Sequence, residues 1–281
     1  MRKQKVHRRL LWGIGIVLLC TILTLCLHGP LFPYSPMIVG FQQRASARAD
    51  LYYHRSTDTS AFAGIDALIG EVEAFHGMHF QHREQLVACG SMQEYRLLTG
   101  GSKARMVTFF PYGRVLVPPR TLQDTAGKRI HADVYLKHEL SHALLCQQLP
   151  LTRFNVLPVW LKEGLAVYSA GQLGCDSYPS KAAIRQYIQQ GYFIYPNDCG
   201  KSGARMPEYV KEQPPFIRDA RFWYSESACL VGDIIEQYGK DRFMQFVQLL
   251  LHEGTADKDF ARVFGITIAD YCQGFRQRMR Q

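Results

Sequence analysis

An uncharged apolar run near the start of the chain sets the first limit on its fold. Residues 10–27 (LLWGIGIVLLCTILTLCL) contain no charged side chain, and a helix of about 20 apolar residues crosses the hydrocarbon core of a bilayer. Residues 1–9 hold five Lys and Arg and no acid, and a basic flank of this kind stays on the cytoplasmic side. The sequence therefore predicts a single-pass membrane anchor, with a cytoplasmic N-terminus and the remainder of the chain periplasmic or extracellular.

A cleaved signal peptide is the alternative for this run. Signal peptides usually have a shorter apolar core that ends at a small-x-small cleavage site. Here the run ends in Leu27-His28-Gly29-Pro30, which offers no such site, and the next small-x-small triplet, at 45–47, lies too far downstream. We therefore expect a retained anchor rather than a cleaved leader.

Charge and cysteine content narrow the class of protein. Beyond residue 9 the chain has 28 basic and 24 acidic residues and no basic stripe interleaved with aromatic residues, so we expect no nucleic-acid partner. Six cysteines lie outside the anchor and none forms a CxxC pair, which argues against a cysteine zinc cluster. Disulfides are favoured outside the cytoplasm, and Cys175 and Cys199 are the first candidate pair because they bracket a loop-rich segment.

The order of periodic segments predicts an α+β fold with a small N-terminal mixed sheet and a helical C-terminal part. Residues 28–57 carry three prolines and no clear period, which is typical of a linker, and residues 58–281 form the folded domain. Its later part includes a loop-rich insertion at 171–222. Inside the domain the patterns predict strands at 85–88, 104–110 and 113–117 and helices at 58–76, 91–98, 127–149, from 158 onward, 224–238, 240–252, 257–264 and 267–279.

The predicted helix over 127–149 contains the sequence His138-Glu139-Leu140-Ser141-His142. Residues four apart share one helix face, so both imidazoles can bind the same ion. Zinc accepts imidazole nitrogen, and catalytic zinc sites use three protein ligands and a water molecule. Glu139 lies one residue along the helix, where its carboxylate can reach that water as a general base without occupying a ligand position. The alternative is an ordinary amphipathic helix that happens to carry two histidines.

A third ligand is predicted on the next helix. Glu163 follows His142 by 21 residues, and nearly all of its neighbours in WLKEGLAVY are apolar. A buried carboxylate needs a partner, and a bound cation supplies one. Cys146, one turn beyond His142, is not expected to be a ligand, because three ligands spaced by four residues spread over about 12 Å of helix axis.

These two motifs resemble those of the gluzincin metallopeptidases, in particular the peptidase MA-like domains. The resemblance covers roughly residues 60–278. It implies a zincin-like fold, one Zn²⁺ bound by His138, His142 and Glu163, and Glu139 as general base. It also implies a tyrosine near the oxyanion, for which Tyr224 is the candidate and Tyr168 the runner-up.

The resemblance implies two further features, a peptide-binding edge strand and an acid that orients a zinc-binding histidine. An edge strand that binds an extended peptide is expected near 113–117, which makes Gly113, Arg114 and Val115 candidate substrate-binding residues. An acid usually orients one zinc-binding histidine. Asp233 and Glu226 are the only candidates that we find for it.

The sequence thus predicts a membrane-anchored zinc metallopeptidase that acts on peptide or protein substrates. Two other functions remain open at this point. One is an extracytoplasmic binding or regulatory module that holds zinc without turnover, and the other is a zinc hydrolase of cell-wall amides. An intramembrane protease is excluded because the segment around the motif is too polar and too short in apolar length to span a bilayer.

Overall fold

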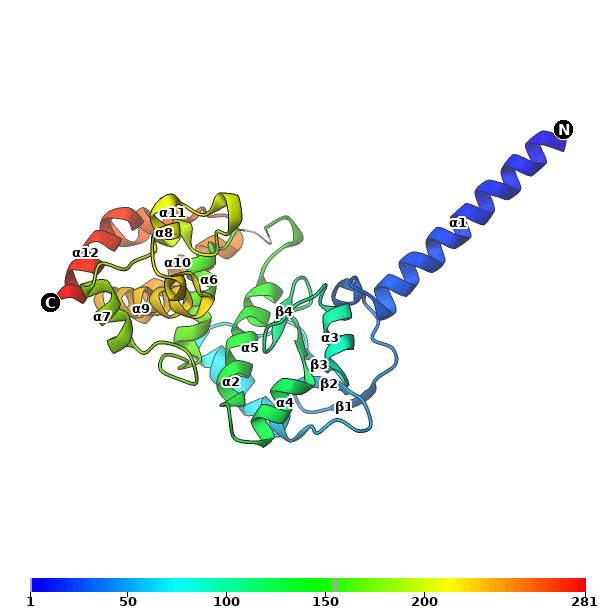
Figure 1. Ribbon diagram of the computed structural model, residues 1–281, viewed down its shortest axis with the longest axis horizontal. Helices are drawn as coiled ribbons and strands as arrows, with labels where there is room; N and C mark the ends of the chain where they lie inside the picture. Colours follow the sequence, from blue (N-terminus) through cyan, green and yellow to red (C-terminus); the bar gives the residue numbers. More distant parts are fainter. Residues whose placement is uncertain (1, 154–155) are drawn as a thin grey trace.

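The computed structural model describes residues 2–153 and 156–281, with side chains from residue 11 onward, so the side chains of the basic tip at 1–9 lie outside it. The described residues form a mixed α+β protein with one five-stranded sheet and twelve α-helices. Helix α1 (Arg2–His28) projects from a body in which the sheet lies nearer to α1 and the later helices form a second lobe (Figure 1). The predicted α+β class is confirmed.

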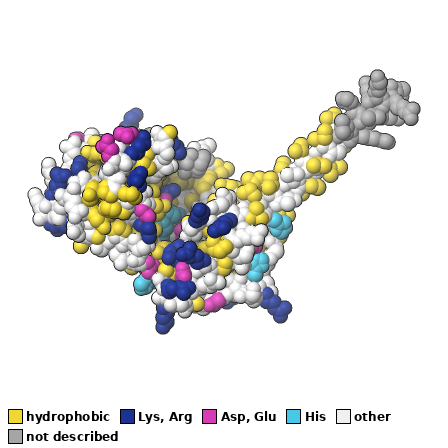
Figure 2. Space-filling view, in the orientation of Figure 1, with side chains coloured by type: hydrophobic (Ala, Val, Ile, Leu, Met, Phe, Trp, Pro, Cys, Tyr) yellow, Lys and Arg dark blue, Asp and Glu magenta, His cyan; other side chains and the backbone are white. Residues whose placement is uncertain are grey.

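Helix α1 agrees with the predicted apolar segment. Its window Leu11–His28 has a mean hydropathy of 2.2 and is 0% buried. Hydrophobic side chains cover much of the helix between the body and the grey tip (Figure 2). A helix of this length and composition at an N-terminus is either a membrane span or a signal sequence.

The sheet has the strand order β1-β2-β3-β5-β4. The three inner strands are parallel, and both edge strands, β1 and β4, pair antiparallel with their neighbours. Strands β3, β4 and β5 lie where the sequence predicts strands. The five strands are β1 (Gln42–Ala45), β2 (Ala49–Tyr53), β3 (Glu84–Ala88), β4 (Val107–Phe109) and β5 (Arg114–Val117).

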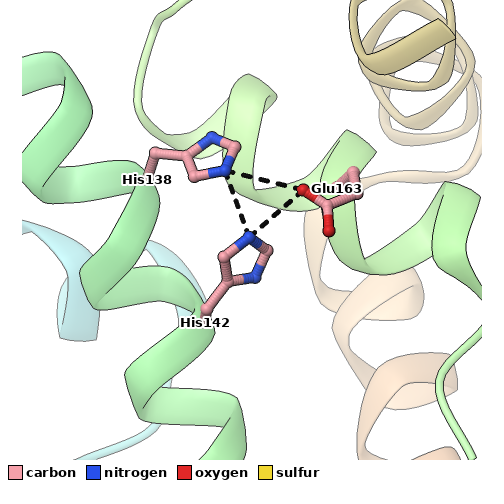
Figure 3. A group of neighbouring side chains, drawn as sticks. All are labelled: His138, His142 and Glu163. Atoms are coloured by element: carbon pink, nitrogen blue, oxygen red, sulfur yellow. Dashed lines mark hydrogen bonds and ion pairs between the residues drawn. The ribbon is translucent and has the colours of Figure 1, made fainter. Parts of the chain in front are cut away.

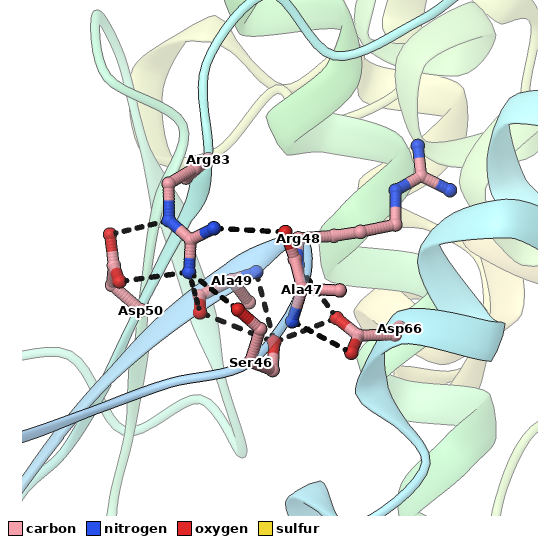
Figure 4. Close-up of polar contacts among 7 residues, drawn as sticks. All are labelled: Ser46, Ala47, Arg48, Ala49, Asp50, Asp66 and Arg83. Atoms are coloured by element: carbon pink, nitrogen blue, oxygen red, sulfur yellow. Dashed lines mark hydrogen bonds and ion pairs between the residues drawn. The ribbon is translucent and has the colours of Figure 1, made fainter.

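The predicted linker over 28–57 is wrong, because it contains β1 and β2. These strands are fixed by residues distant in the sequence. The Asp66 carboxylate accepts hydrogen bonds from Ser46 Oγ at 2.7 Å and from the backbone N–H of Arg48 at 2.9 Å, which holds the turn between the two strands (Figure 4). The Arg83 guanidinium donates to the backbone carbonyl of Ser46 at 2.8 Å and pairs with Asp50. No local pattern in 28–57 reports such contacts.

The predicted peptide-binding edge at Gly113–Val117 is also wrong. Strand β5 lies between β3 and β4, so its backbone groups are used on both sides. Arg114 and Val115 are fully buried. Gly113 has φ +72°, and a Cβ there would lie 2.9 Å from the backbone oxygen of Ala143, so the turn packs directly on a helix and leaves no space for a ligand. Because β4 precedes β5 and pairs on its outer side, β4 is the edge strand.

Helices cover both faces of the sheet because side chains on successive strand positions point to opposite faces. On one face Leu86 and Val115 pack against α2 (Ile65–His76) and α5 (Ala132–Gln148). On the other face Val87 and Leu116 pack against α3 (Met92–Leu98). The motif helix α5 is shorter than the predicted 127–149, because residues 127–131 form the turn that follows a separate helix, α4 (Pro119–Ala126). The predicted helix over 58–76 likewise begins later, at Ile65.

The second lobe is helical, and the four predicted C-terminal helices are confirmed. The loop-rich segment 171–222 contains two α-helices and three short 3-10 helices, and its residues Ile184 and Ile188 enter the same core as the later helices. This segment is therefore an integral part of the lobe. The helices are α6 (Val159–Ser169), α7 (Lys181–Gln189), α8 (Glu208–Lys211), α9 (Ala220–Tyr238), α10 (Lys240–His252), α11 (Ala256–Phe264) and α12 (Ile268–Arg280).

The predicted disulfide between Cys175 and Cys199 does not form. All eight cysteines of the chain are free. Cys199 is buried, and its Sγ lies 3.7 Å from the hydroxyl of Ser227 on α9. Cys175 is only partly buried, and its Sγ lies 3.5 Å from the backbone oxygen of Gly171.

Candidate metal centre

Three predicted ligands converge between α5 and α6. His138 and His142 extend from one face of α5 toward Glu163 on α6 (Figure 3). The two Nε2 atoms are 3.1 Å apart, and the Glu163 Oε2 atom lies 3.6 Å from His138 Nε2 and 3.3 Å from His142 Nε2. The three ligand atoms lie within 4.8 Å of one another. His138 and Glu163 are each only 6% exposed, so the group is a largely buried set of two nitrogens and one carboxylate oxygen that could hold a metal ion.

A glycine sets the position of the third ligand. Gly164 follows Glu163, and a Cβ on it would lie 2.7 Å from the backbone of Ser227 on α9. Only a residue without a side chain permits this approach. Helix α9 therefore packs tightly on α6 directly behind the carboxylate, which also brings Tyr224 of α9 to the site.

The electrostatics of the group favour a cation at its centre. Burial alone would raise the pKa of Glu163, but His142, His138 and Lys162 hold that pKa well below its ordinary value. Burial would likewise lower the pKa of His138, but the hydrogen bond to Glu163 and the charge of Glu139 raise it. An ionised carboxylate thus faces two imidazoles in a buried place, which is a donor set that suits Zn²⁺.

Gln172 orients the first histidine. Its Oε1 atom lies 2.8 Å from His138 Nδ1, and its side chain is 1% exposed. With the Nδ1 proton donated to this oxygen, the lone pair of Nε2 faces His142 and Glu163, as metal binding requires. Gln172 lies in the turn that follows α6. The partner of His138 Nδ1 is therefore a neutral amide and not the predicted acid.

The two acids proposed for that role are engaged elsewhere. Asp233 accepts hydrogen bonds from the Tyr271 hydroxyl at 2.5 Å and from Arg278. Glu226 accepts a hydrogen bond from the backbone N–H of Ile194 at 3.1 Å. Sequence reasoning missed Gln172 because nothing local in the sequence shows that the chain turns back to α5 after α6.

The predicted base lies beside the group and is held by the edge strand. The Thr108 hydroxyl of β4 lies 2.6 Å from Glu139 Oε2 and 3.1 Å from the backbone oxygen of Glu139. Glu139 is 9% exposed. Thr108 was not predicted as a site residue. The Thr108 hydroxyl fixes Oε2 of Glu139, and Oε1 has no hydrogen bond to Thr108.

Of the two tyrosine candidates, Tyr224 is the one at the site. Its ring stacks on His138 with 6.1 Å between centroids and an interplanar angle of 18°. Burial and the neighbouring carboxylate of Glu163 raise the pKa of Tyr224, so its phenol keeps the proton and can donate it in a hydrogen bond. A second phenol, Tyr178, has its ring 6.4 Å from that of Tyr224. Tyr168, the runner-up, packs its ring on Phe75 at 6.0 Å.

His76 packs against the motif helix α5 without a ligand role. It is fully buried; its Nε2 lies 2.9 Å from Ser141 Oγ and its Nδ1 2.9 Å from the backbone oxygen of Val72. Burial lowers the pKa of His76 to about 4. A neutral imidazole with both nitrogens engaged is a packing element that supports α5, as expected for a core histidine.

No family model matches the chain, and no curated protein matches it.

Proposed function

We propose that this chain is a membrane-anchored, zinc-dependent metallopeptidase with a zincin-like fold of the gluzincin type. The observation that supports it best is the convergence of His138, His142 and Glu163, with the charge of Glu139 acting on His138. Two imidazoles and one carboxylate are the ligand set of several zinc peptidases, in which the remaining position holds water or substrate. The extracytoplasmic placement rests on the basic residues at 2–9, which precede the apolar run within α1.

The residues of the chain divide the work of peptide hydrolysis among them. Zinc held by the three ligands would lower the pKa of a water molecule to about 7 and would act as a Lewis acid toward the carbonyl oxygen. Glu139 takes the proton of the attacking water and returns it to the leaving amine. The Thr108 hydroxyl fixes the carboxylate of Glu139 for this transfer. The Tyr224 phenol donates a hydrogen bond to the oxyanion, which is typically worth about 2.7–4 kcal/mol.

Strand β4 is the element best suited to hold the substrate backbone. It is the sheet edge next to α5, and its central residue is the one that contacts Glu139. An extended peptide can pair with such an edge, because main-chain hydrogen bonds are available there. This assignment replaces the one that the sequence suggested for 113–117, one strand further into the sheet.

The proposal is tested with the full chain in lipid nanodiscs. Zinc per chain is determined by elemental analysis, and cleavage of a mixed peptide library is followed for wild type and Glu139→Gln. A matched control is Glu71→Gln, which changes an exposed glutamate that pairs with Lys137. We expect one zinc in all three proteins and a loss of cleavage of about 10²–10⁴-fold in Glu139→Gln alone.

The other outcomes discriminate among the remaining functions. A wild type without zinc would remove the basis of the proposal. Zinc without peptide cleavage in wild type would refute the peptidase and favour a binding module. Cleavage of cell-wall amides with no cleavage of peptides would favour an amide hydrolase that uses the same residues.

A further inference from the structure

Four large side chains are exposed where the chain leaves α1. Three of them, Leu31, Tyr34 and Met37, are 38%, 53% and 52% exposed and follow the helix within ten residues. The fourth is Tyr112, 37% exposed, in the turn between β4 and β5. Single exposed apolar residues are ordinary, but a group that continues an apolar helix is not. We call these four residues the exit collar.

The exit collar begins directly at the end of α1. The backbone N–H groups of Gly29 and Leu31 both donate to the carbonyl oxygen of Leu25, at 3.0 and 3.2 Å. A Cβ on Gly29 would lie 2.9 Å from Leu25 Cα, so the chain turns tightly against the last turn of the helix. The short 3-10 helix that follows, Phe32–Tyr34, therefore stays close to the end of α1.

The exit collar is fixed to the sheet. The buried Arg114 donates to the carbonyl oxygens of Phe32 at 2.7 Å and Ser35 at 2.9 Å. Its guanidinium also lies 5.5 Å from the centre of the Tyr112 ring. The ring of Tyr34 meets Phe109 of β4 edge-on at 6.2 Å. The segment after α1 and the turn that carries Tyr112 therefore both pack on the sheet and form one surface.

We infer that the exit collar rests in the head-group region of the bilayer that α1 crosses. Tyrosine is enriched at that depth because its ring is apolar and its hydroxyl can reach water. Leucine and methionine add apolar area next to the end of the apolar helix. The surface is continuous with α1, and this selects the lipid interface over any other partner. The inference rests on α1 as a membrane span.

This placement bears on the substrate if the proposed peptidase activity holds. Phe109, which contacts Tyr34, is the neighbour of Thr108, which binds Glu139. One short strand therefore connects the lipid-facing surface to the candidate site. Peptide segments that lie close to the membrane surface are the substrates that this geometry favours.

Tryptophan quenching by brominated lipids tests the inference on the full chain in nanodiscs. In a Trp12→Phe background, which removes the tryptophan of α1, we would compare Tyr34→Trp with Tyr195→Trp. Tyr195 is 40% exposed and lies in the helical lobe, so it is a matched control. Trp160 and Trp223 remain in every variant, and their signal is subtracted with the Trp12→Phe protein. We expect at least a two-fold reduction of the added fluorescence in Tyr34→Trp and none in Tyr195→Trp.

Separate readouts keep the possible failures apart. Quenching of Trp12, taken as the difference between wild type and the Trp12→Phe protein, reports on α1 alone. If Trp12 is quenched and Tyr34→Trp is not, the exit collar does not contact lipid and the inference is overturned. If neither is quenched, α1 does not cross this bilayer and the inference falls with it. Met37→Trp repeats the measurement at a second collar position in case Tyr34→Trp does not fold. Zinc content and cleavage, measured on the same samples, judge the peptidase independently.

Discussion

The sheet half (residues 29–148) and the helical half (residues 159–281) are held together in different ways. In the sheet half the decisive contacts join distant segments, such as the pair formed by Arg114 and Phe32 and the pair formed by Asp66 and Ser46. In the helical half, α6 and α9 also pack across a long stretch of sequence, but the ends of α9 and α11 are set locally, by Gly239 and Gly265. Local sequence therefore carries more information about the helical half than about the sheet half.

The candidate metal centre lies where the two halves meet (Figure 1). The sheet half contributes His138, Glu139 and His142 from α5. The helical half contributes Glu163 from α6, Gln172 from the turn that follows α6, and Tyr224 from α9. If both halves are needed for chemistry, changes in the helical half should lower activity or metal binding without changing the residues of α5.

The largest effect of this kind is expected from Tyr224→Phe. Loss of one donor to an oxyanion typically lowers kcat by about 10²–10³-fold, and the ring that stacks on His138 is kept. Bound zinc should be unchanged. The measurement is kcat and KM with a peptide cleaved by wild type, beside Tyr168→Phe, which removes a hydroxyl from α6. Equal activities of Tyr224→Phe and wild type would mean that the hydroxyl only packs.

Removal of the amide that orients His138 should weaken metal binding. Loss of such an outer partner typically costs about 10–100-fold in metal affinity, so Gln172→Leu should bind zinc that much more weakly in competition with a chelator. Gln172→Glu retains an oxygen acceptor and should restore most of the affinity. If leucine and glutamate give the same affinity as wild type, Gln172 fills space and does not orient the ligand.

The difference between the sheet half and the helical half also explains which parts of the fold the sequence predicts. Helices α9 to α12 end near their predicted limits because glycines and the N-cap Thr267 act locally. Strands β1 and β2 were missed because β2 forms by pairing with β3, β1 forms by pairing with β2, and Asp66 and Arg83 hold the turn between them. The prolines that precede them suggest a linker. If the segment before residue 50 were removed as a linker, the protein would lose β1 and the buried Phe32.

The site shows the same limit. His138, Glu139, His142 and Glu163 follow from helix periodicity and spacing, and the structure places them together. Gln172 and Thr108 belong to segments that reach α5 only after folding, so spacing does not reveal them. The error about 113–117 has a similar origin, because the order of strands along the chain differs from their order in the sheet.

A pair of helix glycines, one from each half, tests how tightly each half is packed. Gly164→Ala would place a Cβ 2.7 Å from the backbone of α9, and overpacking of this kind costs about 1–3 kcal/mol. Gly70 on α2 has only Arg48 Nη1 within reach, at 3.6 Å. There alanine should be neutral or stabilise by up to about 1 kcal/mol. Chemical unfolding of both variants gives the comparison. A neutral Gly164→Ala would show that α6 and α9 can separate without cost.

The smallest expected effect concerns a buried glutamate in each half. Burial raises the pKa of both Glu84 and Glu226 well above the ordinary value of 4.5. The folded protein therefore keeps a proton that the unfolded chain releases as pH rises above about 4.5. The stability contributed by each carboxyl is fully present below that pH and is lost as pH rises toward the folded pKa.

Glutamine at either position stays neutral, so Glu84→Gln and Glu226→Gln should be more stable than wild type at pH 8, with the difference shrinking toward pH 4.5. Unfolding at both pH values measures this, with the exposed Glu71→Gln as control. The increase in the free energy of unfolding at pH 8 should be larger for Glu84→Gln than for Glu226→Gln. Burial dominates the pKa of Glu84, whose carboxyl accepts a hydrogen bond from the neutral Gln147 amide, whereas the Ile194 N–H and the positive charge of Arg276 partly stabilise the Glu226 carboxylate. A larger gain at Glu226 would mean that these two groups do not reach its carboxylate, and that the helical half tolerates charge less well than the sheet half.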